Sequence, residues 1–184
     1  MRRVAVFVFG SIAILTLSRH SLNRPGSHGF YRHFAFQAIL AILVSNAQRW
    51  FAKPRAPRQL ASWTLLAASL GMAVHGFYLL RTVGRPAAGQ AGTEGLLHGI
   101  EDTSQLVRVG AYRYIRHPLY ASLLFLCWGA VLKRPTVLPV LLGNVATFAL
   151  SLTAEAEEDE NRARFGAEYD EYCRHTRRFV PFVF

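Results

Sequence analysis

The chain has 184 residues, a formal net charge of +10 and a hydrophobic content of 52%. With a mean hydropathy of +0.19, it carries more apolar surface than one domain of this length can bury in a core. The basic residues are scattered between apolar segments and no nucleic-acid-binding module is recognisable, so nucleic acid is not an expected partner. The composition predicts one membrane domain, residues 1–184, whose basic loops lie beside anionic lipid headgroups.

Apolar segments without charge predict an all-α bundle that is integral to the membrane. They are residues 4–18, 34–48, 59–80, 119–132 and 135–154. The first follows two arginines, but no small-x-small cleavage site comes after it, so we interpret it as a retained helix. The first, second and fourth are shorter than the roughly 20 residues of a full crossing. About five transmembrane helices are therefore predicted, with four as the alternative, and the last two form a helical hairpin.

Polar side chains interrupt these segments at Asn46, His75 and Asn144. In lipid such groups most often hydrogen-bond between helices, which is the interpretation we favour. A ligand-binding role is the alternative.

The basic residues of the loops predict the topology. With five spans, thirteen of the 21 Lys and Arg residues lie on the side of the first loop, the third loop and the C-terminal tail. This bias places that side in the cytoplasm. Arg2 and Arg3 favour the opposite orientation, because they precede the first helix.

The third loop divides into two parts. Residues 81–103 are Gly-rich without a periodic apolar face, which predicts a loop. The next stretch, "TSQLVRVGAYRYIRHP", places two arginines and a histidine directly before an apolar helix. Gly110 permits a sharp bend, and Pro118 is compatible with the first turn of a helix but disfavours helical geometry at His117. We expect this stretch to fold back over the helix start.

The tail, "TAEAEEDENRARFGAEYDEYCRHTRRFVPFVF", continues from the last apolar segment. Helical spacing places Glu158, Arg162, Phe165, Tyr169 and Tyr172 in one stripe. The stripe is either a solvated acidic helix end with packed aromatic side chains or part of a binding surface.

Together, "GAYRYIRHPLY" and "EAEEDENRARFGAEYDEYCRHTRRFVP" resemble the signature of the isoprenylcysteine carboxyl methyltransferase family, which phospholipid N-methyltransferases share. The family pattern is roughly G-x-Y-x-x-x-R-H-P-x-Y-x-G, a helical hairpin, a Glu-Glu pair, and F-G-x-E-Y-x-x-Y before a proline. The resemblance covers residues 104–181 with the spacing preserved. The matching residues are Gly110, Tyr112, Arg116, His117, Pro118, Tyr120, Glu157, Glu158, Phe165, Gly166, Glu168, Tyr169, Tyr172 and Pro181.

The resemblance implies an S-adenosylmethionine-dependent membrane methyltransferase. Residues 104–184 would form its cofactor-binding core behind N-terminal helices in residues 1–80, with a C-terminal cytoplasmic helix covering the cofactor pocket. Arg116, His117 and Glu157 would be positioning residues, because a carboxylate can pair with the cofactor's ammonium while aromatic faces favour its cationic sulfur. The implied cofactor-binding residues are Ser104, Gln105, Leu106, Val107, Tyr112, His117, Pro118, Leu119, Tyr120, Glu157 and Glu158. Glu158 is either a second contact or a structural partner of Arg162.

Two residues depart from the family pattern. Ser122 stands where the family has glycine, and Thr153 stands where isoprenylcysteine enzymes have an arginine for the substrate carboxylate. We therefore expect a lipophilic acceptor with a carboxylate, amine or thiol, and we do not assume prenylcysteine. The implied location is a bacterial inner membrane, multi-pass, with the cofactor site facing the cytoplasm.

Two other functional classes stay open. Membrane sterol reductases resemble the same C-terminal region and use NADPH, although they usually have more spans. A non-catalytic membrane scaffold would bind no cofactor. Neither Cys127 nor Cys173 belongs to a C-x-x-C pair, and the histidines have no metal-ligand spacing, so no disulfide or metal site is expected.

Overall fold

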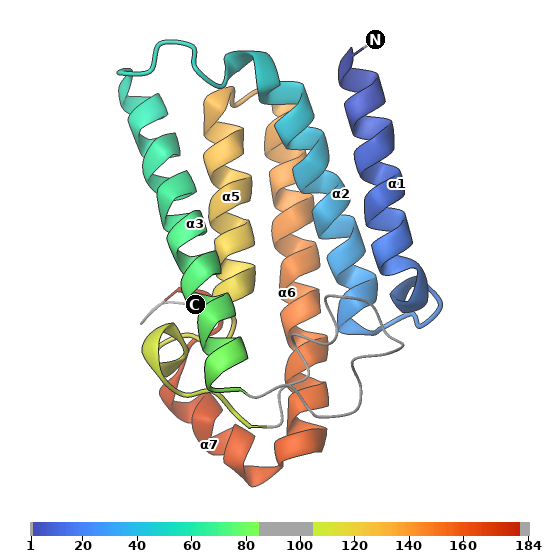
Figure 1. Ribbon diagram of the computed structural model, residues 1–184, viewed down its shortest axis with the longest axis vertical. Helices are drawn as coiled ribbons and strands as arrows, with labels where there is room; N and C mark the ends of the chain where they lie inside the picture. The colour runs from blue at the N-terminus through green and yellow to red at the C-terminus, as the bar shows by residue number, and fades with distance from the viewer. Residues whose placement is uncertain (1, 85–104, 181–184) are drawn as a thin grey trace.

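The computed structural model describes residues 2–84 and 105–180, which form an up-and-down helical bundle (Figure 1). The five long helices lie side by side, and the short α7 lies beyond one end of the bundle, beside the end of α6 (Figure 1). No strand occurs in the described part of the chain, which confirms the all-α prediction. The helices are α1 (Arg2–Leu22), α2 (His28–Asn46), α3 (Pro57–Thr82), α5 (Pro118–Lys133), α6 (Val137–Phe165) and α7 (Ala167–His175), with 3-10 turns at Ala47–Arg49 (η1) and Gly110–Arg113 (η2).

Each predicted apolar segment lies mostly in one of the five long helices, although 34–48 runs past the end of α2 and 135–154 begins before α6. Three of these helices, α1, α3 and α6, are long and apolar enough to cross a membrane. The 16-residue α5 is apolar but shorter. The long apolar helices identify an integral membrane protein.

Local sequence explains where several helices begin and end. The Ser27 hydroxyl accepts the Phe30 N–H over 3.3 Å and so caps α2. Pro57 and Pro118 occupy the first turns of α3 and α5, where a missing N–H costs no hydrogen bond. Gly166 separates α6 from α7 with φ of 58°, a backbone conformation that favours glycine. As a result, α7 turns away from α6 instead of continuing its axis.

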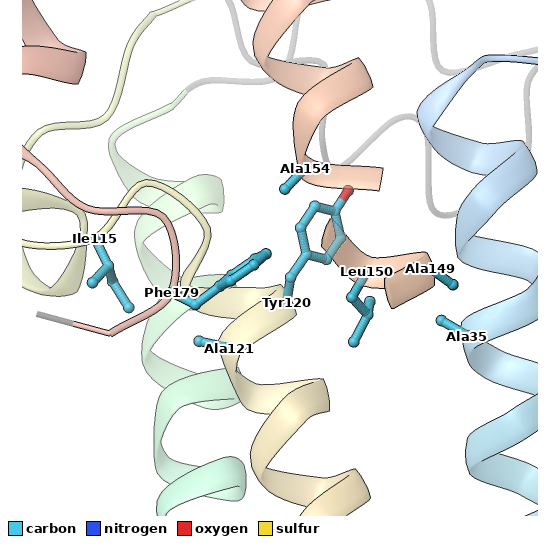
Figure 2. Close-up of a cluster of buried hydrophobic side chains, with 8 residues drawn as sticks. All are labelled: Ala35, Ile115, Tyr120, Ala121, Ala149, Leu150, Ala154 and Phe179. Atoms are coloured by element: carbon cyan, nitrogen blue, oxygen red, sulfur yellow. The ribbon is translucent and has the colours of Figure 1, made fainter. Parts of the chain in front are cut away.

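Small side chains bring the helices together. In the bundle α3 packs against α5, α2 against α6, and α1 against α2. Figure 2 shows the buried cluster near the cavity end, in which Ala35 of α2 faces Ala149 and Leu150 of α6. Tyr120 and Phe179 complete the same cluster from α5 and the tail. The C-terminal tail therefore belongs to the core of the bundle.

Buried polar groups join the helices. The Asn46 side-chain amide donates to the Ala130 carbonyl over 2.8 Å, and the Ser62 hydroxyl donates to the Gly129 carbonyl over 2.6 Å. The interhelical interpretation is thus confirmed for Asn46. Asn144 instead donates to Val140 of its own helix, and His75 accepts the Ala111 N–H of the η2 turn over 3.3 Å.

Candidate functional site

The tail is attached to the segment before α5 by backbone hydrogen bonds. Ile115 and Arg177 form an isolated parallel β-bridge. The Arg116 N–H donates to the Arg177 carbonyl over 2.7 Å, and the His117 N–H donates to the Arg178 carbonyl over 3.2 Å. The backbone at His117 has φ of −123° and ψ of 65°, outside the helical region, as the following proline requires. The stretch before α5 is therefore joined to the tail by one isolated bridge and neighbouring backbone hydrogen bonds.

Glu158 is the centre of a buried ionic network. Its side chain is 2% exposed, and its Oε1 accepts the Arg116 Nε–H over 2.9 Å. Arg178 donates to both carboxylate oxygens, over 3.1 and 2.9 Å, and His117 Nε2 lies 3.3 Å from Oε1. Arg162 stands farther away, at 3.8 Å. The carboxylate therefore joins α6 to the α5 corner and the tail, and Arg116 and Arg178 are its principal partners.

Helix α7 is held over the same region by Tyr172 and Arg108. The Tyr172 hydroxyl donates to the Tyr112 carbonyl over 2.6 Å. Arg108 donates to both the carbonyl and the carboxylate of Glu168 over 2.9 Å. Burial raises the pKa of Tyr172 and of Tyr169 above the ordinary tyrosine value, so both phenols stay neutral donors at physiological pH.

A cavity that is open to solvent lies between the end of α3, the start of α5, the extension of α6 and α7. The cavity is lined by Leu80, Leu106, Val107, Tyr112, Arg116, His117, Leu119, Tyr120, Glu157, Asn161, Phe165, Tyr169 and Tyr172.

The polar groups of the cavity converge on Glu157. Its side chain is 25% exposed, and one of its carboxylate oxygens accepts the Tyr120 hydroxyl. His117 Nδ1 lies 3.9 Å from the other oxygen. The His117 and Tyr120 rings stack with centroids 5.4 Å apart. Because the two neighbouring glutamates differ in this way, Glu158 is neutralised by its partners while the Glu157 carboxylate faces the cavity among aromatic rings.

Most of the predicted site residues meet in this cavity: Leu106, Val107, Tyr112, Arg116, His117, Leu119, Tyr120 and Glu157. Three described residues do not line it. The Gln105 N–H donates to the Gly84 carbonyl over 3.3 Å, whereas Pro118 and Glu158 are buried behind the cavity wall. The remaining one, Ser104, lies outside the described residues, as does Pro181 of the matching motif.

Five lining residues were not among the predicted cofactor contacts: Leu80, Asn161, Phe165, Tyr169 and Tyr172. Asn161 stands one helical turn after Glu157, so the spacing of four indicates its position. The three aromatic residues were part of the predicted stripe. Leu80 carries no sequence signal of its own, because it is one leucine among many at the end of α3.

Thr153, at the position of the family arginine, is fully buried. Its hydroxyl donates to the Ala149 carbonyl of the same helix over 2.7 Å. The residue therefore satisfies its own hydrogen bond within α6 and presents no cation there.

Comparison with known proteins gives relatives at modest identity. No family model and no solved structure matches the chain. The protein-S-isoprenylcysteine O-methyltransferase B of Arabidopsis thaliana is 26% identical over 183 residues, 97% of this chain and 89% of the relative. A probable protein-S-isoprenylcysteine O-methyltransferase of Oryza sativa subsp. indica is 29% identical over 130 residues, 66% of this chain and 63% of the relative.

A third relative has a different printed activity. The methanethiol S-methyltransferase of Crocosphaera subtropica is 29% identical over 72 residues, 39% of this chain and 28% of the relative. Every one of these three relatives is a methyltransferase by name. Taken together, these names support, at modest identity, a likeness to the isoprenylcysteine methyltransferase family.

Proposed function

We propose that the protein transfers a methyl group from S-adenosylmethionine to a lipophilic acceptor in the membrane. The observation that carries this proposal is the Glu157 carboxylate, which faces the cavity among the aromatic rings of Tyr112, Tyr120 and Tyr169. A cavity of this kind suits a ligand that carries positive charge and a flat ring system.

The lining fits the proposed cofactor. Glu157 can accept hydrogen bonds from an ammonium group, and the Asn161 amide beside it can both donate and accept. Leu80, Leu106 and Leu119 supply apolar walls for an adenine ring. When bound, S-adenosylmethionine supplies an electrophilic methyl group on a cationic sulfur. The residues of this chain bind and orient the reactants and exclude water, which is the main contribution that an in-line displacement requires.

Arg116, His117 and Glu157 are proposed as positioning residues. His117 and Tyr120 hold the Glu157 carboxylate in place, through the 3.9 Å approach and the hydroxyl hydrogen bond described above. Arg116 and Glu158 do not hold Glu157 directly. Their hydrogen bond joins the segment before α5 to α6. We therefore assign Glu158 a structural role and withdraw it from the cofactor contacts proposed by resemblance.

The proposed acceptor is a lipophilic molecule with a carboxylate, an amine or a thiol. Thr153 offers no positive charge for a carboxylate, and one relative is named for a thiol substrate, so a lipophilic thiol is the first acceptor to test. A farnesylcysteine analogue is the second, in view of the plant relatives' names. The measurement is transfer of a labelled methyl group from S-adenosylmethionine to each compound in detergent.

The cofactor is tested by thermal unfolding of the purified protein with S-adenosylhomocysteine or NADPH. We expect S-adenosylhomocysteine alone to raise the melting temperature, because a ligand that binds only the folded state stabilises it. Glu157→Gln should abolish this rise while its own unfolding temperature stays near that of the native protein. Glu155→Gln, an exposed glutamate on the same helix, is the control and should keep the rise. Stabilisation by NADPH would support a reductase instead, and no response to either would support a scaffold.

We also propose that the cavity end of the bundle faces the cytoplasm of a bacterial cell. The test uses single cysteines in a Cys173→Ser background, since Cys127 is fully buried. Ala163→Cys lies on the cavity side and Ala47→Cys on the opposite side, and both positions are exposed. A membrane-impermeant maleimide should label Ala47→Cys in intact cells and Ala163→Cys only after permeabilisation. The reverse pattern would overturn the orientation.

A further inference from the structure

The two ends of the bundle differ in how their charges are used. All 11 Asp and Glu residues lie between positions 94 and 171. At the cavity end, several arginines are paired with them: Arg116 and Arg178 with Glu158, Arg108 with Glu168, and Arg174 with Glu171. The start of α1, the α2–α3 connection and the α5–α6 turn all lie at the opposite end of the bundle (Figure 1). These segments contain no acidic residue.

Five basic residues around the α2–α3 connection and the α5–α6 turn are exposed. The set, which we call the basic rim, consists of Arg49, Lys53, Arg55, Arg58 and Arg134. Within the described parts of the chain, none of the five is in an ion pair. Like charges gathered at one end of the bundle repel one another unless counter-charges are present. The rim is therefore complementary to an anionic partner.

Aromatic side chains beside the rim indicate where that partner lies. Phe51 is 74% exposed and packs on Trp63 with ring centroids 5.8 Å apart. Trp50 meets Trp63 edge-on at 6.4 Å. Tryptophan beside basic residues at the end of an apolar helix is typical of the headgroup level of a bilayer. The anion expected at this depth is a lipid headgroup of the same membrane.

A buried lysine fixes the rim in place. Lys133 is 1% exposed, donates to Gln59 Oε1 over 3.1 Å, and has its ammonium 3.3 Å from the centroid of the Trp63 ring. The Gln59 amide donates back to the Lys133 carbonyl over 3.4 Å. The end of α5 and the start of α3 are thereby joined, so the flanking cations Arg58 and Arg134 project from one rigid base.

From these observations we propose that the basic rim is a binding site for the phosphate groups of anionic phospholipids, at the end of the bundle opposite the cavity. The ionic contact is between guanidinium or ammonium groups and phosphodiester oxygens, for which arginine is well suited. The basic rim shares no residue with the candidate methyl-transfer site. Its proposed lipid binding does not depend on methyl transfer.

The test compares anionic and zwitterionic lipid. The full-length protein in neutral detergent is titrated with phosphatidylglycerol and with phosphatidylcholine of the same acyl chains, and the bound lipid is counted by native mass spectrometry. We expect a preference for phosphatidylglycerol that falls at least about tenfold in the variant Lys53→Gln/Arg55→Gln/Arg58→Gln/Arg134→Gln, since each basic residue near a lipid surface contributes about a fivefold effect. The variant retains all of the Lys133 contacts.

The control removes the same charge from the other end. The variant Arg19→Gln/Arg113→Gln/Arg164→Gln/Arg174→Gln replaces four exposed arginines there and should keep the preference. Equal loss in both variants would show a non-specific effect of net charge and overturn the proposal. Retention of the preference in the rim variant would place the lipid elsewhere. Competition by soluble glycerol phosphate at equal concentration would indicate a free-anion site and reject the lipid headgroup.

Discussion

The Arg116 guanidinium donates its Nε–H to Glu158 Oε1 over 2.9 Å and so connects the corner before α5 with α6. Arg178 completes the connection from the tail with two hydrogen bonds to the same carboxylate. One buried anion thus holds three segments that are distant in sequence. Glu157, the preceding residue, faces the cavity. The position of its carboxylate in the candidate site therefore depends on the Glu158 network.

The first prediction concerns the buried network. Glu158→Gln removes the negative charge but leaves Arg116 and Arg178 in place, so we expect a loss of about 3 kcal/mol in the free energy of unfolding. Glu171→Gln breaks the exposed pair with Arg174 and should cost about 0.5 kcal/mol or less. Denaturant titration of both variants in detergent gives the comparison. Equal effects would mean that Glu158 is not the structural centre inferred here.

The second prediction concerns pH and the tyrosines of α7. Burial raises the pKa of Tyr172, so the folded state holds this proton more tightly than the unfolded chain. The associated stability is present below the unfolded tyrosine pKa of about 10 and is lost as pH rises through the folded value. Tyr172 should therefore not ionise near pH 10 in the folded protein. In a spectrophotometric titration, the native protein and the Tyr172→Phe variant should show the same phenolate signal near pH 10.

The unfolded protein provides the control for that titration. In guanidinium chloride the same Tyr172→Phe variant should lose one tyrosine's signal near pH 10, since the unfolded phenol is solvated. A lost signal of this size in the native protein would contradict the burial of Tyr172.

A third prediction follows from Gly110, which begins the η2 turn beside Tyr112. Its φ is +59°, and a Cβ there would stand 2.5 Å from His75 Nε2. Gly110→Ala should lower the free energy of unfolding by about 2 kcal/mol through backbone strain and steric conflict. Gly71→Ala is the matched control, because nothing lies within 4 Å of its Cβ. That variant should be neutral or more stable by up to about 1 kcal/mol. Similar unfolding curves for both variants would argue against the tight η2 turn.

Helix positions could be predicted from the sequence because charge-free apolar stretches leave few alternatives. The predicted segment 135–154 stopped where the acidic residues begin, whereas α6 continues to Phe165. An apolar stretch predicts the part of a helix that contacts lipid or the core. It does not predict a polar continuation of that helix beyond them. The helical stripe of tail residues did indicate this extension as far as Phe165, since its spacing ignores polarity. Its continuation to Tyr169 and Tyr172 in the same helix was wrong, because Gly166 ends α6 and both tyrosines lie in α7.

The partners of Glu158 illustrate what the sequence could not indicate. Helical spacing pointed to Arg162, four residues away, but that arginine is 43% exposed and stands at 3.8 Å. The closer partners, Arg116 and Arg178, come from segments 42 and 20 residues distant. Local periodicity contains no information about such contacts, which depend on how the tail folds back beside the corner. By contrast, eight of the residues that line the cavity were predicted by resemblance.

The last prediction tests the polar contacts between helices. Asn46 and Asn144 are both asparagines within apolar segments, but Asn46 is 1% exposed and bonds the Ala130 carbonyl of α5, whereas Asn144 bonds its own helix. Asn46→Ala should cost about 1–2 kcal/mol, because the buried carbonyl loses its partner and the packing loosens. Asn144→Ala should change stability by less than about 0.5 kcal/mol. Unfolding in a denaturing detergent series measures both, and a larger cost at Asn144 would mean that its face of α6 packs against a further partner.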